Sequence, residues 1–243
     1  MQARACLFDP SDARVLRTDL RVPPGQPFSR IRLGTDAQRM LCLPNAGGNS
    51  VVSELLSIEL LNTFLQARLL CTEMELEYFP LGSKITDYSV TLDGRTFGVS
   101  VTRAMKFKGR FTPSDAEELL EKKLFGVVQS SKHVLKRYRW DKQILHVFAE
   151  HEYIYDELVR AYDKLPSELR ANTLVLVTVC NASTPFIFYD HLADLPRVVA
   201  AATAATAKVA TVAASSRRDM VASRCAPVAS FAAAPMPTCA VVS

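Results

Sequence analysis

Polar and apolar residues alternate most clearly from Lys84 to Arg103, where the chain reads KITDYSVTLDGRTFGVSVTR. Such alternation is typical of β-strands with one face toward a core. The Leu92-Asp93-Gly94-Arg95 tract supplies an Asp-Gly turn, so the segment predicts a β-hairpin. Asp87 lies on its first strand, and Ser100 and Thr102 share one face of its second strand. An acid in so apolar a strand indicates either a solvated edge or a site.

Two stretches carry helical periodicity. The first begins at Val51, after the N-cap residues Asn49-Ser50, and continues through VVSELLSIELLNTFLQARLL. In it Glu54 shares a face with apolar residues four, seven and eleven positions later, so this carboxylate points toward the core side. The second helix begins with Thr112 as its cap and Pro113 at its first position, followed by SDAEELLEKKLFGVVQSS.

Shorter patterns predict the remaining elements. The segment CTEMELEYF alternates and indicates a half-solvated strand before the hairpin, which makes three strands in a row. After the second helix we expect the strand QILHVFA, a short helix near Glu152 to Leu165, the strand TLVLVTV from Thr173, and a short edge strand over Phe186 to Tyr189.

Changes in composition divide the chain into three parts. Residues 1–40 contain Pro23-Pro24-Gly25 and Pro27 and only isolated apolar residues, so they predict an irregular N-terminal arm. Residues 41–197 predict a single α/β domain. Residues 198–243 repeat Ala, Thr, Val and Ser and predict a disordered, low-complexity tail.

Charge is unevenly distributed over the 243 residues. The net charge is +4, yet residues 41–197 carry 18 basic and 20 acidic residues, so the predicted domain is nearly neutral. Overall basicity therefore gives no argument for nucleic-acid binding, which has to come from local clusters.

The six cysteines form no CxxC pair and no zinc spacing, and no signal peptide begins the chain. We therefore expect an intracellular protein, nuclear or cytoplasmic and not secreted. No apolar run has the length and character of a membrane span, so no membrane association is expected.

The stretch KHVLKRYRWDK is the clearest local basic cluster. Its basic and aromatic residues alternate in a way that suits phosphate contacts and base stacking, and the candidate nucleic-acid-binding residues are Lys136, Arg137, Arg139 and Trp140. The alternative is a solvated connection whose Trp packs onto the domain.

Other catalytic patterns find little support. The four histidines show no ligand spacing, and His146, inside the QILHVFA strand, is interpreted as a core or edge residue. The GGNS tract lacks the lysine of a P-loop, and no nucleophile-elbow motif supports a Ser-His-Asp triad.

The order helix, three strands, helix, strand, helix, strand resembles the core of the PD-(D/E)xK nuclease superfamily over roughly residues 50–179. This resemblance implies a restriction-endonuclease-like fold, a mixed β-sheet flanked by helices in the order αβββαβαβ. It also implies acids on the first helix and the second strand that gather around a divalent metal ion. Glu54 and Asp87 match those two positions and are the candidate ligands for Mg²⁺.

The third strand departs from the superfamily pattern. Ser100-Val101-Thr102 stands where an acid, any residue and a lysine are expected, so Ser100 and Thr102 are the site candidates there. Arg103, Lys122 or Lys123 would then replace the missing lysine. Arg103 faces away from Ser100 by strand alternation, whereas either helical lysine can face inward.

The function implied is a nuclease-like domain that binds nucleic acid, with weak or lost magnesium-dependent phosphodiester hydrolysis. The alternative is a protein-interaction scaffold that keeps the fold and uses its surface for protein partners.

Overall fold

A computed structural model describes residues 2–9, 11–43 and 50–189. The helices among them are α1 (Gln2–Phe8), α2 (Thr35–Cys42), α3 (Val51–Leu65), α4 (Pro113–His133), α5 (Glu152–Lys164), α6 (Ser167–Arg170) and α7 (Pro185–Phe188). The strands are β1 (Val15–Leu20), β2 (Arg68–Thr72), β3 (Tyr88–Leu92), β4 (Arg95–Ala104), β5 (Lys142–Ala149) and β6 (Thr173–Cys180). None of the described helices combines the length and apolar character needed to cross a membrane.

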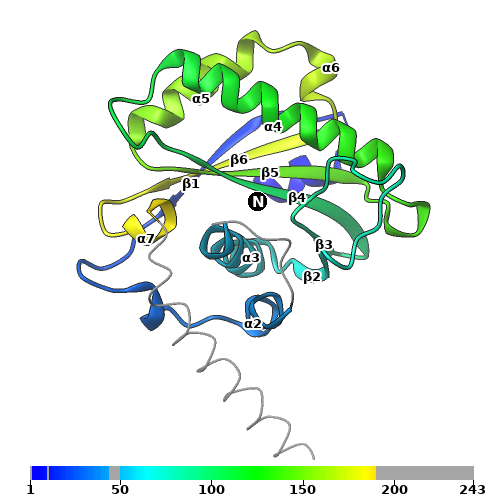
Figure 1. Cartoon of the computed structure of the whole chain (residues 1–243), viewed down its shortest axis with the longest axis horizontal. Coiled ribbons are helices and arrows are strands. Elements are labelled where there is room, and N and C mark those ends of the chain that lie inside the picture. The colour runs from blue at the N-terminus through cyan, green and yellow to red at the C-terminus, as the bar shows by residue number, and fades with distance from the viewer. Residues whose placement is uncertain (1, 10, 44–49, 190–243) are drawn as a thin grey trace, which may run out of the picture. The chain divides into compact units, whose positions relative to one another are not determined.

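The six strands form one mixed sheet in the order β1-β6-β5-β4-β3-β2. β2, β3 and β4 are antiparallel neighbours, whereas β4, β5, β6 and β1 run parallel. α2 and α3 lie on one face of the sheet, and α4 and α5 cover the other (Figure 1). The fold is therefore α/β, a mixed sheet flanked by helices.

The two faces of β4 belong to different layers. Val99 and Val101 pack into the core on the α3 side, and Ala104 packs into the core on the α4 side. Because side chains alternate along a strand, Ser100 and Thr102 face α4.

Elements with strong local signals are confirmed. α3 begins at Val51, and the hairpin turn has Asp93 at φ 49° and Gly94 at φ 77°, the two positive values that a tight hairpin turn uses. At the start of α4, Thr112 and Asp115 cap each other's backbone amides.

The expectation of an irregular arm over residues 1–40 is wrong. This segment contains α1, α2 and β1, and β1 forms the sheet edge beside β6. Its signal is weak because β1 is half-exposed and its partner lies about 160 residues later in the chain. The expected tail, residues 198–243, lies outside the described residues.

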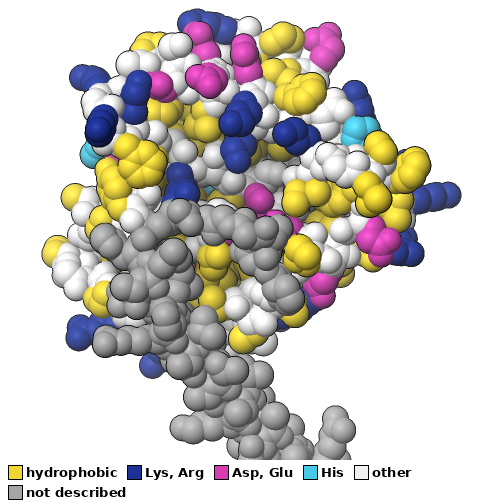
Figure 2. Space-filling view, viewed as in Figure 1, with side chains coloured by type: hydrophobic (Ala, Val, Ile, Leu, Met, Phe, Trp, Pro, Cys, Tyr) yellow, Lys and Arg dark blue, Asp and Glu magenta, His cyan; other side chains and the backbone are white. Residues whose placement is uncertain are grey.

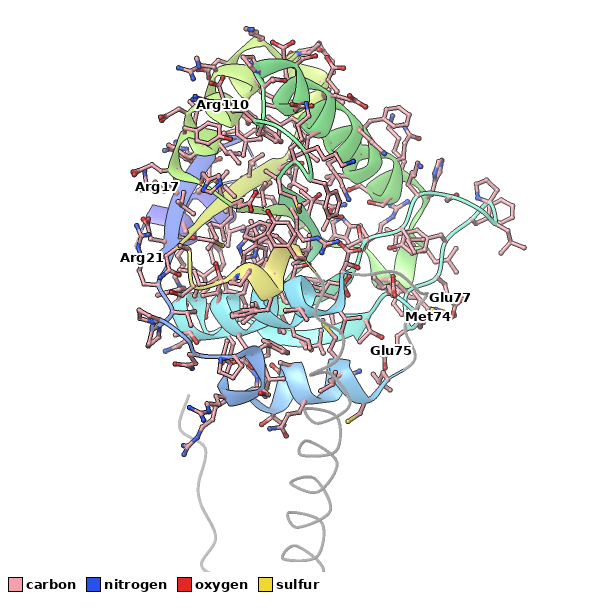
Figure 3. All side chains as sticks on the ribbon, turned by 60° about the vertical axis from the view of Figure 1, so that its left-hand side comes forward. Arg17, Arg21, Met74, Glu75, Glu77 and Arg110 are labelled. Carbon is pink, nitrogen blue, oxygen red and sulfur yellow. The ribbon has the colours of Figure 1, made fainter. Side chains whose placement is uncertain are left out.

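The strand expected in CTEMELEYF is also displaced. α3 ends at Leu65, where the C-cap residue Gln66 has a left-handed backbone with φ 61°. The strand β2 then occupies residues that continue the helical pattern. Residues 73–87 form a loop, on which Glu75 accepts a hydrogen bond from the Thr72 amide. Figure 3 labels Met74, Glu75 and Glu77 there, at the opposite sheet edge from Arg17 of β1.

Two smaller expectations need correction. The first hairpin strand begins at Tyr88, so Ile85 and Asp87 precede it rather than lie within it. The segment at Phe186 is the helix α7 and not an edge strand, because Pro185 starts a helical turn whose three apolar residues are all buried.

Candidate functional site

Glu54 is a buried acid in the first turn of α3. Its backbone amide donates to the Ser50 carbonyl at 3.0 Å, and its side chain enters the interior because nearly every face of this helix start is covered. Only 6% of the residue is exposed. Burial, followed by the nearby Asp87 carboxylate, raises the pKa of Glu54 to about 7, against a hydrogen bond with Ser50 that lowers it.

Asp87 lies directly before β3, at the level where the β3–β4 ladder begins. Because that ladder pairs Tyr88 with Val99, the Val101 amide lies beyond it, and this amide donates to Asp87 Oδ2 at 2.5 Å. Burial raises the pKa of Asp87 to about 6, while the Val101 hydrogen bond and the Lys123 ammonium act in the opposite direction.

The two buried acids also influence each other electrostatically, since the Asp87 charge is one cause of the raised pKa of Glu54. Burial disfavours the ionised form of each carboxyl, and the charge of Asp87 adds to this for Glu54, so both groups can hold a proton near neutral pH. Figure 2 shows acidic side chains near the middle of the face on which α3 is seen end-on, with basic side chains beside them.

The structure also distinguishes between the two candidate lysines. Lys123 is half-buried, and its charge lowers the pKa of both Glu54 and Asp87. Lys122 is exposed on the neighbouring position of α4. Arg103 lies on the α3 side of β4, where it donates to the Ile187 carbonyl at 3.2 Å. Of the three candidates, Lys123 is the one whose charge lowers the pKa of both acids.

Ser100 and Thr102 are buried on the α4 face of β4 and offer neutral oxygens only. A third acid, Glu73, raises the pKa of both Glu54 and Asp87. Sequence reasoning missed Glu73 because its alternation with Met74 suggested a solvated strand face. Among the described residues, no group of three or more His, Cys, Asp or Glu side chains is placed to hold a metal ion.

The residues of the basic stretch KHVLKRYRWDK differ in their surroundings. Lys136, Arg137 and Arg139 are exposed, but Arg137 forms an ion pair with Glu77. Trp140 is half-buried, and its Nε1 donates to Ser131 Oγ at 3.1 Å.

Lys142, the last cation of that stretch, is buried and serves a structural role. Its ammonium donates to the carbonyls of Cys6 and Asp9, at 2.8 and 2.7 Å, and to that of Asp12. This cation therefore ties the end of α1 to the sheet and does not reach a ligand.

His146 lies in a buried chain of hydrogen bonds rather than in a catalytic triad. Its Nδ1 is 2.7 Å from Ser57 Oγ, and its Nε2 is 2.7 Å from Thr178 Oγ1, where a triad would need a carboxylate. All three side chains are fully buried, so Ser57 has no access to a substrate.

Comparison with known proteins adds one relative. No protein-family model matches the chain, and no solved structure matches it significantly. The chain is similar to the AAC-rich mRNA clone AAC4 protein of Dictyostelium discoideum, with 48% identity over 153 residues, which are 60% of this chain and 22% of that protein. The chain thus spans less than a quarter of this relative, whose name states no activity.

Proposed function

We propose that this chain carries a restriction-endonuclease-like domain that binds nucleic acid, with weak or lost magnesium-dependent phosphodiester hydrolysis. Support comes from the element order α3, β2, β3, β4, α4, β5, α5, α6, β6, which, apart from the short helix α6, is similar to the helix, three strands, helix, strand, helix, strand order of the resemblance. The pairing of antiparallel β2, β3 and β4 with parallel β5 suits a mixed sheet of that kind.

The observation that carries the proposal is that two buried acids, Glu54 and Asp87, both have raised pKa values and that the charge of Asp87 acts on Glu54. These acids, one on α3 and one in the loop before β3, are 33 residues apart in sequence, yet the Asp87 carboxylate raises the pKa of Glu54. Burying two interacting carboxyls destabilises a fold unless a proton, a cation or a ligand compensates them. Such an arrangement is typical of functional sites.

The donor set fits a hard divalent cation. Glu54 and Asp87 supply carboxylate oxygens, the ligand type that Mg²⁺ prefers. Bound Mg²⁺ polarises a phosphate and lowers the pKa of a bound water. The residues of the chain would position the reacting groups. The Val101 amide orients the Asp87 carboxylate, and Lys123 would place a positive charge near an approaching phosphate. With only neutral Ser100 and Thr102 on β4, we expect weak metal affinity.

Magnesium titration calorimetry tests this site. We expect binding at millimolar Mg²⁺ at pH 7.5, and at least about tenfold weaker binding at pH 5.5, because the ion requires deprotonated carboxyls whose pKa values are about 7 and 6. Asp87→Asn should abolish the binding heat. The matched control is Asp93→Asn, which removes a half-exposed acid at the hairpin turn and should leave the affinity unchanged.

One observation favours the scaffold as a second candidate. The loop between β2 and β3 exposes Phe79 by 73% and Leu81 by 94%, and exposed apolar clusters of this kind mark protein contact surfaces. If neither heat nor a melting shift appears at millimolar Mg²⁺, or if Asp93→Asn and Asp87→Asn behave alike, the scaffold becomes the better interpretation.

A further inference from the structure

A pocket of about 330 Å³ opens between the end of α4 and the starts of β5 and β6. Polar and aromatic side chains in its wall include Lys132, Arg139, Trp140, Asp141, Gln143 and Asn172. The pocket lies on the α4 side of the sheet, and α4 also carries Lys123. Ser131, in the pocket wall, is eight residues after Lys123 on this helix, which corresponds to a distance of about 12 Å along the helix axis.

Two amide side chains of this wall have unused acceptors. Gln143 is 2% exposed, and its Nε2 donates to the Val127 carbonyl at 3.0 Å and to Ser131 Oγ at 2.8 Å. Asn172 Nδ2 donates to the Asp141 carbonyl at 2.6 Å. These bonds fix which end of each amide is the nitrogen, and they leave both buried oxygens, Gln143 Oε1 and Asn172 Oδ1, without a partner among the described residues.

A buried acceptor without a donor is destabilising, so these two oxygens favour a ligand that brings N–H groups. The indole of Trp140 lies beside Gln143 Oε1. Both groups pack directly over Gly98, which has no side chain. A Cβ atom added to Gly98 would lie 2.8 Å from this indole and 3.1 Å from Gln143 Oε1, so the ring and the oxygen occupy the same small space. A ligand that reaches the oxygen therefore contacts or displaces the indole.

Charge at the pocket favours an anion. Lys132 and Arg139 are both exposed, and Arg139 has no acidic partner within the described part of the chain. The one acid of the wall, Asp141, already accepts a hydrogen bond from the Thr96 amide at 3.1 Å. Arg137, two residues before Arg139, is instead paired with Glu77.

We propose that this pocket binds one nucleotide of a single strand, with an amino-bearing base against Gln143, Asn172 and Trp140 and its phosphate on Arg139 and Lys132. Its volume is near the lower end of small-molecule sites, about 300–1,000 Å³, which suits one nucleotide and not a duplex. The inference rests on the proposed function, because it names the form of nucleic acid that the domain would hold.

The base preference follows from the amide oxygens. Cytosine presents an amino group where uracil presents a carbonyl. Cytidine monophosphate (CMP) therefore offers two N–H donors to the two oxygens, whereas uridine monophosphate (UMP) offers one ring N–H and places its carbonyl oxygen against the other. We expect CMP to bind at least about tenfold more tightly than UMP, since an unpaired buried acceptor is retained with UMP.

Trp140 is the single tryptophan of the chain, so its fluorescence reports on the pocket directly. The titrations use CMP, UMP, cytidine and inorganic phosphate with the full chain in a chelator, so that the metal site plays no part. Arg139→Ala should weaken CMP binding by about tenfold, as expected for a charge-assisted phosphate contact. Arg137→Ala is the matched control and should not change it, and Asp87→Ala should also retain CMP binding.

Several results would overturn the proposal. These are equal affinities for CMP and UMP, inorganic phosphate competing as well as CMP, no saturable change at millimolar CMP by fluorescence or calorimetry, or equal effects of Arg139→Ala and Arg137→Ala. A cytidine tetranucleotide that binds no more tightly than CMP would overturn the link to a strand. Loss of magnesium binding alone would instead refute only the nuclease-like site.

Discussion

At the scale of single residues, the centre of the sheet is a chain of neutral hydrogen-bonding groups. The side chains in order are Tyr88, Ser57, His146, Thr178 and Thr18, with 2.5 to 2.7 Å between successive atoms. They join α3 to four strands, β3, β5, β6 and β1. Burial lowers the pKa of His146 to about 3, so its imidazole stays neutral at physiological pH.

This neutral histidine makes stability depend on pH. In the unfolded chain His146 is protonated below its ordinary pKa of about 6.5, whereas in the folded chain it is protonated only below a pKa of about 3. Its contribution is therefore complete above pH 6.5 and is lost as pH falls toward 3, with a slope approaching about 1.4 kcal/mol per pH unit. Urea unfolding of the native chain and of His146→Gln, at several pH values, measures this difference.

The difference between the two chains is the informative quantity, because Glu54 and Asp87 act in the opposite direction. Their folded pKa values of about 7 and 6 exceed the unfolded ones, so their protonation stabilises the fold as pH falls through that range. Both acids are present in either chain and cancel in the comparison. A difference that stays flat between pH 6.5 and 4 would show that His146 is not held neutral.

At the scale of elements, α4 positions Lys123 of the candidate site and one wall of the nucleotide pocket, and its start is fixed by a capping box. Thr112 Oγ1 accepts from the Asp115 amide at 3.3 Å, and the Thr112 amide donates to Asp115 Oδ2 at 2.8 Å. Thr112→Ala should lower the free energy of unfolding by about 1 kcal/mol, whereas Thr112→Ser keeps the hydroxyl and should be nearly neutral. Chemical denaturation of both variants measures this, and equal losses would assign the effect to the methyl group.

Elements that the sequence predicts well are those with a complete local signal. The capped start of α4, the Asp-Gly turn and the apolar runs of β5 and β6 depend on neighbours within a few residues. The start of β2 was missed because RLLCT continues a helical pattern, and only the left-handed Gln66 ends the helix before it. Local propensity is a weak prior where one backbone conformation decides the boundary.

The candidate site shows the same division between local and long-range information. Glu54 and Asp87 were chosen through the resemblance, because a helix start and a hairpin are both visible in the local sequence pattern. Choosing Lys123 over Lys122 required the rotation of α4 against the sheet, which the pattern of adjacent lysines does not encode. Glu73 was missed because only the path of the loop after β2 returns it to the two acids.

At the scale of the whole described fold, the sheet joins its first strand in sequence, β1, to its last strand, β6. β1 pairs with β6 through six residues, from Val15 beside Val175 to Leu20 beside Cys180. The preceding helix α1 buries Leu7, and α1 together with the turn after it supplies the carbonyls of Cys6 and Asp9 that hold the Lys142 ammonium. A segment that resembles a detachable arm by composition is therefore part of the core.

Deleting residues 1–20 should consequently prevent cooperative folding or lower the melting temperature severely. The deletion exposes the edge of β6 and opens the core around Leu7. It also leaves the buried Lys142 ammonium without acceptors, and an uncompensated buried charge alone costs about 3–5 kcal/mol. Deleting residues 198–243 is the comparison, and it should leave the melting temperature unchanged because that segment has few large apolar residues with which to offset its ordering entropy. Adding Lys142→Met to the N-terminal deletion removes the uncompensated charge and should restore part of the lost melting temperature. Calorimetric melting of the three variants beside the full chain provides the measurement, and an N-terminal deletion that melts like the full chain would contradict the role assigned to β1.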